Sequence, residues 1–328
     1  MNTKCRLLLA CAALLLMVGQ AHAAYVDAPV GYTVQDTVFP IPYAWSVYGF
    51  DRLPSGNFVA FIGQDVVEVT KAGVVGAPLY SFKDSVYGSF VKVRDSTIYF
   101  GESSNGAIWS MGLDGSNPAM MGTLGNNYDL EFNSLGQAFV SANPGWAGQK
   151  LFFFDGAGDE VVTGLSGYSG PLAFDAQDNL LYETAYAAGG DSILRFDEAE
   201  VAGAIGSGSL TQADGQVLAS VNPPADMEMD ALGNVFFTSG GVLYRLLNGS
   251  TAATAFASSE CTLTTLRCNP SDNSFSMLVG GATDGGNAVG VISTIVPVPE
   301  PCSLICFATG LISLAGTCVM RRRKCLPR

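Results

Sequence analysis

The chain has 328 residues, of which 48% are hydrophobic and 14% charged, and its formal net charge is −13. Residues 24–320 hold nine Lys and Arg residues against all 29 Asp and Glu residues, a net charge of −20. Such an acidic chain repels phosphate backbones, so nucleic-acid binding is excluded as an expected function. The single histidine, His22, lies near the N-terminus. Catalysis and zinc binding by histidine are therefore excluded beyond it, and any metal site there would use oxygen ligands, as Ca²⁺ and Mg²⁺ sites do.

Residues 1–23 have the organisation of an export signal. Lys4 and Arg6 form a basic start, an apolar stretch follows, and Ala-His-Ala ending at Ala23 is a cleavage site of the A-x-A kind. We therefore predict cleavage after Ala23 and an exported protein. A lipoprotein signal ending at Cys11 is the alternative, but it would leave almost no apolar core ahead of that cysteine.

The region 24–296 repeats a short motif about every forty residues. The unit is an apolar strand, a polar turn and a second strand that ends in small residues. It occurs six times, with turns centred on Gly56, Ser96, Gly136, Asp178, Gly233 and Asn273. One interval is longer, and we expect residues 197–215 to be an insertion there, with a short helix near 198–205.

Three or four short strands per repeat are typical of a β-propeller blade. Each small sheet has two apolar faces and must bury both against its neighbours, so six repeats predict an all-β, six-bladed propeller. We expect residues 32–40 to close the ring beside residues 288–296. A β-sandwich or two separate domains are the alternatives, and the even spacing through six units argues against them.

The repeat resembles the units of NHL, SMP-30/gluconolactonase and TolB-like six-bladed propellers over roughly residues 46–296. The segment PADMEMDALGNVFFTS (224–239) is nearest to their pattern, and Asp230 and Gly233 match its turn. The channel-facing Asp of these families has no match, because Ala225 occupies its position. The resemblance therefore implies the propeller fold without carrying over a lactonase-type metal site.

Five residues are candidates for a ligand site. Asp129, Glu131, Asp226 and Glu228 stand at or near the first strand of two units, and this strand lines the central channel of a propeller. They are candidates to bind Ca²⁺ or to act as an acid–base pair. The alternative is that they are solvated at the channel mouth or face outward. Trp146 lies in a loop rich in Gly and Pro and is a candidate to stack on a sugar.

Two functions are consistent with this sequence. The main prediction is a binding or structural role without chemistry or a cofactor, with an extracellular polysaccharide or a surface protein as partner. The alternative is a Ca²⁺-dependent lactonase- or lyase-like enzyme that uses the channel carboxylates. The enzyme requires at least three oxygen ligands around one point.

Cys261 and Cys268 are the two cysteines of the repeat region. Export favours a disulfide between them. The segment that joins them, CTLTTLRC, has the pattern of a strand, and seven strand steps separate its ends by roughly 23 Å, beyond the reach of a disulfide. The sequence leaves both states open and favours free thiols.

The C-terminal segment has three parts: a Pro-rich link (297–302), an uncharged apolar stretch (303–320) and a basic tail (321–328). The apolar stretch, as a helix, would span roughly 27 Å, about the thickness of a bilayer core. The link holds the motif Val298, Pro299, Glu300 and Pro301. The tail begins with the membrane stop Arg321, Arg322, Arg323 and Lys324. Basic residues at this place predict that the tail stays cytoplasmic and that the propeller lies outside.

The order Pro-Glu-Pro, apolar helix and basic cluster resembles the PEP-CTERM sorting tag of Gram-negative bacteria. The resemblance implies processing near the motif by an exosortase, a membrane-embedded enzyme that resembles a cysteine transpeptidase. It also implies delivery to the cell surface, where carriers of the tag are often linked to extracellular polysaccharide. The two prolines keep the motif extended, as entry into a protease-like site requires. A plain membrane anchor is the alternative.

Overall fold

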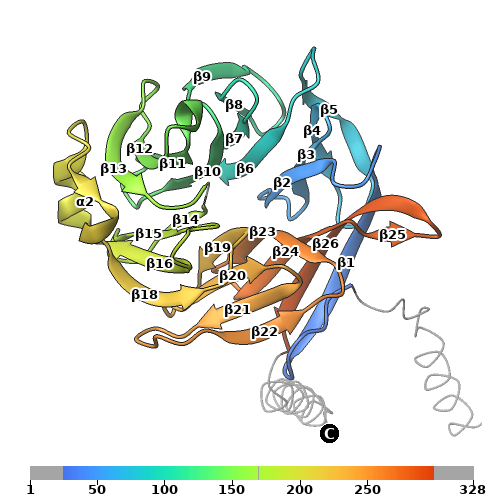
Figure 1. The fold of residues 1–328 in the computed structure, drawn as a ribbon. Helices are drawn as coiled ribbons and strands as arrows, with labels where there is room; N and C mark the ends of the chain where they lie inside the picture. The colour runs from blue at the N-terminus through green and yellow to red at the C-terminus, as the bar shows by residue number, and fades with distance from the viewer. Residues whose placement is uncertain (1–24, 169, 299–328) are drawn as a thin grey trace, which may run out of the picture.

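The computed structural model describes residues 25–168 and 170–298 and arranges them as six sheets in a ring (Figure 1). The predicted all-β, six-bladed propeller is therefore confirmed. The predicted export signal, residues 299–302 of the link, the apolar stretch and the basic tail lie outside the described residues. Within the described ranges, no helix is long and apolar enough to cross a membrane.

Five blades are antiparallel sheets whose four main strands follow chain order. Blade 1 consists of β2 (Val47–Arg52), β3 (Phe58–Ile62), β4 (Asp65–Val69) and β5 (Val75–Ser81). Blade 2 consists of β6 (Gly88–Arg94), β7 (Thr97–Glu102), β8 (Ala107–Gly112) and β9 (Ala119–Thr123). Blade 3 consists of β10 (Asn127–Phe132), β11 (Ala138–Ala142), β12 (Gln149–Phe153) and β13 (Asp159–Leu165).

The next two blades have the same order. Blade 4 consists of β14 (Leu172–Phe174), β15 (Leu180–Glu183), β16 (Asp191–Phe196) and β18 (Gln216–Val221). Blade 5 consists of β19 (Asp226–Met229), β20 (Val235–Ser239), β21 (Val242–Leu246) and β22 (Thr254–Ser258). The first strands β2, β6, β10, β14, β19 and β23 contact one another in succession and form the innermost ring of the propeller (Figure 1).

Blade 6 closes the ring by joining the two ends of the propeller. It consists of β23 (Thr262–Asn269), β24 (Ser274–Gly280), β26 (Asn287–Pro297) and, as outer strand, β1 (Tyr32–Pro40). The antiparallel register of β1 and β26 runs from Tyr32 opposite Pro297 to Pro40 opposite Val289, which confirms the predicted closure. A short strand, β25 (Thr283–Asp284), extends the hairpin into β26.

The hairpin turns follow the predicted repeat. Five of the six predicted turn centres have a left-handed backbone: Gly56, Gly136, Asp178, Gly233 and Asn273. Gly, Asn and Asp are the residues that adopt this conformation most readily. In blade 2 the left-handed residue is Asp95 and not Ser96, because Arg94 pairs with Thr97 and the turn is only two residues long.

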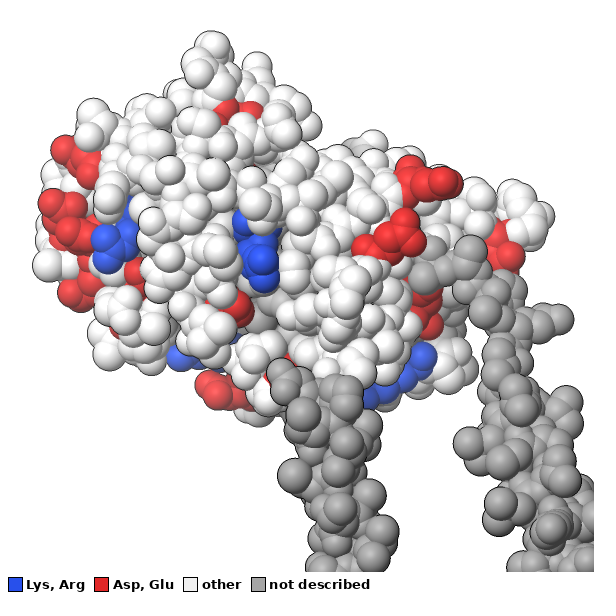
Figure 2. All heavy atoms as spheres, turned by 90° about the horizontal axis from the view of Figure 1, so that it is seen from below, with Lys and Arg blue, Asp and Glu red and all other residues white. Residues whose placement is uncertain are grey.

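The long interval between the fourth and fifth turns holds the predicted insertion and its helix. This insertion contains α2 (Glu198–Ala204), β17 (Leu210–Thr211) and the 3₁₀ turn η2 (Gln212–Asp214). Strand β17 pairs in parallel with β13 of blade 3, while Val201 and Ala204 are buried between blades 3 and 4. The insertion thus ties two blades together. Acidic side chains gather at the end of the edge-on view where α2 lies (Figure 2).

Large apolar side chains fill the spaces between blades. Between blades 1 and 2, Phe61 stacks on Phe82 with ring centres 5.5 Å apart, and Trp109 stacks on Phe100 at 6.4 Å.

Both thiols, Cys261 and Cys268, are free within the described chain, and β23 holds Cys268 in an extended segment. The strand between the two cysteines and the free thiols that the sequence favoured are therefore both present.

Candidate functional site

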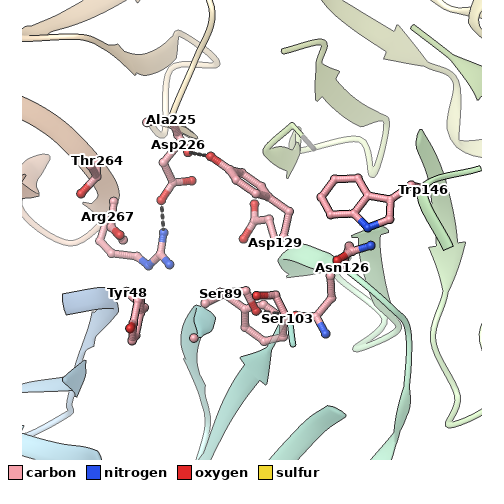
Figure 3. A pocket seen from close by; sticks show the side chains of 15 residues that line it. Tyr48, Ser89, Ser103, Asn126, Asp129, Trp146, Ala225, Asp226, Thr264 and Arg267 are labelled. Carbon is pink, nitrogen blue, oxygen red and sulfur yellow. Dashed lines mark hydrogen bonds and ion pairs between the residues drawn. The ribbon is translucent and has the colours of Figure 1, made fainter. Parts of the chain in front are cut away.

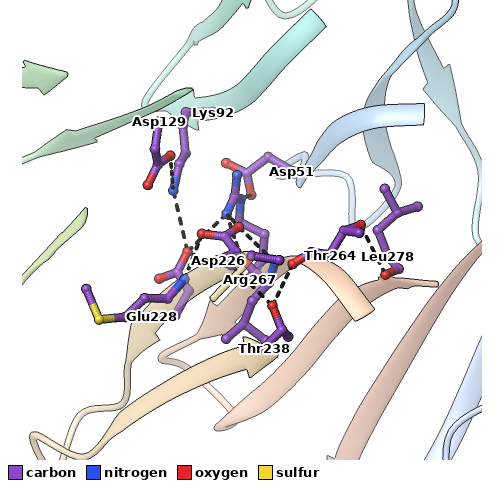
Figure 4. A network of polar contacts seen from close by, with 12 residues as sticks. Asp51, Lys92, Asp129, Asp226, Glu228, Thr238, Thr264, Arg267 and Leu278 are labelled. Atoms are coloured by element: carbon purple, nitrogen blue, oxygen red, sulfur yellow. Dashed lines mark hydrogen bonds and ion pairs between the residues drawn. The ribbon is translucent and has the colours of Figure 1, made fainter. Parts of the chain in front are cut away.

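Charged side chains from five blades meet at the axis of the propeller (Figure 4). They alternate in sign around much of the ring: Asp51, Lys92, Glu131, Glu228 and Arg267, on β2, β6, β10, β19 and β23. Blade 4 presents the apolar strand β14 at this place. The ion pairs that join these groups run between neighbouring blades and across the axis, so the centre of the ring is filled by a polar network.

Lys92 is the cation of this network that reaches across the ring. Its ammonium forms an ion pair with Glu131 of the next blade and lies 3.8 Å from Oδ1 of Asp129. It also lies 3.6 Å from Oε1 of Glu228, which comes from the opposite blade. The side chain of Lys92 is buried, so these carboxylates replace the water that the ammonium has lost.

Arg267 joins blades 5, 6 and 2. Its Nη1 lies 2.8 Å from Oδ2 of Asp226 and 3.4 Å from Oε1 of Glu228. Its Nη2 donates a hydrogen bond of 3.1 Å to the carbonyl of Val91 on blade 2. Burial opposes the guanidinium charge, but the surrounding carboxylates, Asp226 first among them, outweigh burial and raise the pKa of Arg267 above its usual value.

Three aspartates repeat one hydrogen-bond pattern that links neighbouring blades. One carboxylate oxygen accepts from the next residue of its own strand, in the pairs Asp51 with Arg52 (2.6 Å), Asp129 with Leu130 (2.9 Å) and Asp226 with Met227 (2.8 Å). The other oxygen accepts from the first strand of the next blade, in the pairs Asp51 with Val93 (2.6 Å), Asp129 with Leu172 (3.1 Å) and Asp226 with Leu266 (2.9 Å). These aspartates therefore stabilise the ring itself.

The four carboxylates predicted from the sequence are brought together, but their surroundings are neither those of a Ca²⁺ site nor those of a solvated channel mouth. Asp129 and Asp226 are buried and bonded to backbone N–H groups, while Glu131 and Glu228 are ion-paired, so the expectation that they are solvated is wrong. Their oxygens are already engaged, and a Ca²⁺ ion would need them free. Within residues 25–168 and 170–298, no group of three or more Asp, Glu, Cys or His side chains is placed to hold a metal ion.

Burial shifts the protonation of two of these carboxyls. It raises the pKa of Glu228 to about 7, against the opposing effect of Lys92 and Arg267. It also raises the pKa of Asp129, opposed chiefly by Lys92. Both groups can therefore hold a proton at a higher pH than an exposed carboxyl does.

Glu183, at the end of β15, is a buried carboxyl that sequence reasoning missed. It is fully buried, and among the described residues neither carboxyl oxygen has a hydrogen-bond partner. Burial, and then the neighbouring carboxyls of Asp191 and Asp226, raise the pKa of Glu183 well above its usual value. The sequence feature that could have indicated this buried carboxyl is an acidic residue directly after the apolar strand LLY.

A cavity of about 350 Å³ lies above the network, at the end of the ring where the first strands begin (Figure 3). Asp129, Asp226 and Arg267 line it, and Trp146 lies at its edge. The hydroxyl of Tyr128 donates a 2.6 Å hydrogen bond to the carbonyl of Ala225, bridging blades 3 and 5 across the cavity. Gly88 and Phe90 line the cavity as well, and most of the other lining residues carry hydroxyl or amide side chains: Tyr48, Ser89, Ser103, Asn126, Asn127, Thr264 and Thr265.

Trp146 ends the 3₁₀ turn η1 (Pro144–Trp146) between β11 and β12. Its side chain is 71% exposed, and its backbone is left-handed with φ of 59°. This tryptophan therefore lies in a connection between strands, and a ligand in the adjoining cavity can contact it. Glu131 and Glu228, by contrast, belong to the network beneath the cavity. Nothing in the sequence singled out Tyr48, Tyr128 or Arg267 as lining residues.

The fold and the cavity define a six-bladed β-propeller with a polar, aromatic-edged pocket at the channel mouth. Comparison of the sequence with protein-family profiles and with curated proteins gives no match. Comparison with solved structures finds a gluconolactonase from Xanthomonas campestris, with a TM-score of 0.65, 13% identity and coverage of 84% of this chain and 96% of that one.

Two further solved structures are similar. A putative gluconolactonase has a TM-score of 0.61 and 14% identity over 82% of this chain and 93% of that one. A putative glucose dehydrogenase from Thermus thermophilus has a TM-score of 0.60 and 12% identity over 81% of this chain and 100% of that one. At such identities the likeness establishes the fold alone.

Proposed function

We propose that the channel-mouth pocket binds a sugar or a sugar lactone. The observation that carries the proposal is Trp146, an exposed indole held beside a cavity lined by hydroxyl, amide, carboxylate and guanidinium groups. A saccharide ring offers matching chemistry, because its C–H faces stack on an aromatic ring and its hydroxyls form hydrogen bonds. The volume, about 350 Å³, lies at the lower end of the range for small-molecule sites.

The backbone of Trp146 supports a functional role for this residue. A left-handed conformation is unfavourable for a bulky residue, costing roughly 1 kcal/mol or more. Trp146 gains little burial in return, since most of its surface is exposed. A strained and exposed aromatic residue beside a polar cavity is a feature that ligand binding explains.

The second candidate is an enzyme that hydrolyses a sugar lactone. Likeness to two structures described as gluconolactonases favours this alternative over binding alone. Asp129 and Asp226 supply carboxylates to the cavity, and the raised pKa of Asp129 suits a proton donor. The described carboxylates do not fit a Ca²⁺ site, so this candidate rests on acid–base chemistry by these side chains.

One experiment separates the two candidates. The full-length protein, in detergent, is titrated with glucose, gluconate and glucono-δ-lactone by calorimetry, and lactone opening is followed by proton release with and without added Ca²⁺ or chelator. Binding that Trp146→Ala weakens and the exposed control Tyr168→Ala does not supports the proposal. Proton release above the uncatalysed rate supports the enzyme, and absence of binding to all three compounds contradicts both candidates.

We also propose that the chain is exported, held by residues 303–320 and cut near Val298–Pro301 by an exosortase-type enzyme. The position of the motif supports this. Strand β26 ends at Pro297, and the Val298 N–H still donates a 2.8 Å hydrogen bond to the carbonyl of Gly31. A cut after this point would release the complete propeller with its closing strand pair.

The proposal for the tag is tested by replacing Pro299, Glu300 and Pro301 with alanine. The expected result is a full-length protein that stays in the membrane fraction while the wild-type protein becomes shorter and leaves it. The same size and location for both proteins would favour the plain anchor instead.

A further inference from the structure

A second cavity adjoins the channel-mouth pocket. It has a volume of about 170 Å³ and shares Tyr48 and Thr264 with the first cavity. The second cavity lies between blades 1 and 6, beside the first cavity and on the same face of the ring. Trp146 lines the first cavity, and Trp45 lines the second.

The chain holds Trp45 in place at a conformational cost. Its backbone is left-handed, with φ of 65°, in the short segment between β1 and β2. Its indole rests on the backbone of Gly280 and Gly281, where an added Cβ atom would come within 2.3 Å and 2.9 Å of the ring. Glycine at both positions makes this close approach possible. The side chain nevertheless remains 54% exposed, so one side of the ring is supported and much of the rest is free.

The surroundings of Trp45 are uncharged and aromatic. All residues that line the second cavity are uncharged: Ile41, Trp45, Val47, Tyr48, Thr264, Leu278, Val279, Gly280, Gly281, Val289 and Gly290. Tyr48 joins the two cavities, and its ring packs edge-on against the exposed Tyr87 at 6.4 Å. A neutral ligand with apolar ring faces fits this surface, whereas a charged ligand would find no countercharge there.

We propose that Trp45 forms a second sugar subsite next to the one at Trp146, so that the ligand is an uncharged oligosaccharide or polysaccharide and not a single sugar. This inference rests on the proposed saccharide binding at the first pocket. Two exposed indoles, each held in a strained backbone conformation, line two adjoining cavities that share Tyr48. An extended chain of sugar rings can contact both indoles, while a single ring contacts one.

The test is the dependence of affinity on chain length. Neutral hexose oligomers of one to six units, presented in several linkages, are titrated against the full-length protein in detergent. We expect the affinity for the best linkage to rise about tenfold or more from one unit to three, which corresponds to roughly 1.4 kcal/mol. Trp45→Ala should remove this rise and leave single-sugar binding unchanged, while Trp146→Ala should weaken both.

The outcomes distinguish the second subsite from the first. Single-sugar binding that depends on Trp146 but shows no gain with length in any linkage overturns the second subsite and leaves the first in place. Failure of every sugar to bind overturns both and favours a protein partner. If Trp45→Ala does not fold, Gly280→Ala displaces the indole and Trp45→Phe retains a ring. A length dependence lost in the first variant and kept in the second supports the proposal, and the same dependence in both contradicts it.

Discussion

Removing the charge of Arg267 should destabilise the propeller more than any surface change. Arg267→Met keeps the length of the side chain but leaves Asp226 and Glu228 without the guanidinium 2.8 and 3.4 Å away. It also removes the hydrogen bond to the Val91 carbonyl on blade 2. Removing one partner of a buried ion pair costs about 3–5 kcal/mol, because the other charge stays buried.

Thermal melting and urea unfolding of the purified protein measure this loss. A loss of about 3–5 kcal/mol corresponds to a melting temperature lower by roughly 6–20 °C for a domain of this size. Arg195→Met is the matched control, because the Arg195 side chain is 31% exposed and one of its two partners, Asp197, is 64% exposed. Its loss should stay below about 1 kcal/mol.

Two further variants separate charge from geometry. Arg267→Lys keeps the charge but cannot hold the carboxylates and the Val91 carbonyl together, so we expect an intermediate loss of about 1–3 kcal/mol. Combining Arg267→Met with Asp226→Asn should cost less than the sum of the single changes, since the uncompensated charge is removed. A loss of less than about 1 kcal/mol for Arg267→Met would refute the view that this network holds the blades together.

Two other predictions concern Glu183 and the closing strand. The folded-state pKa of Glu183 is raised, so unfolding releases its proton and wild-type stability should fall as the pH rises above the ordinary carboxyl pKa. The free energy of unfolding of Glu183→Gln, relative to that of wild type, should therefore increase between about pH 5 and 7. The exposed control Glu200→Gln should show no such trend in urea unfolding. Phe39 is buried in β1 against Gly290, and Phe39→Ala should cost about 3–5 kcal/mol in thermal melts. An unchanged melt would contradict closure by β1.

Much of the fold could be predicted because each blade repeats local chemistry. The left-handed turn residues, such as Gly136 and Gly233, recur at a fixed distance from the apolar strands, and that distance defines the blade. These features depend on neighbours in sequence, which the sequence displays directly.

The network at the axis depends on residues that are neighbours only in space. Lys92 and Arg267 lie in the strand segments FVKVR and TLRCN, and a cation among largely apolar residues was the only sign of burial. Their partners come from blades 3, 5 and 1, so each contact depends on the register of strands far apart in the chain. Sequence reasoning predicted four carboxylates of the network and missed Asp51 and the two cations.

The most direct test of sugar binding at the channel mouth is a crystal structure of the protein grown with a saturating neutral hexose oligomer. We expect a sugar ring stacked on the indole of Trp146, with hydroxyls bonded to the side chains of the adjoining cavity. An empty pocket at saturating sugar, or a sugar bound away from Trp146, would contradict sugar binding at this site.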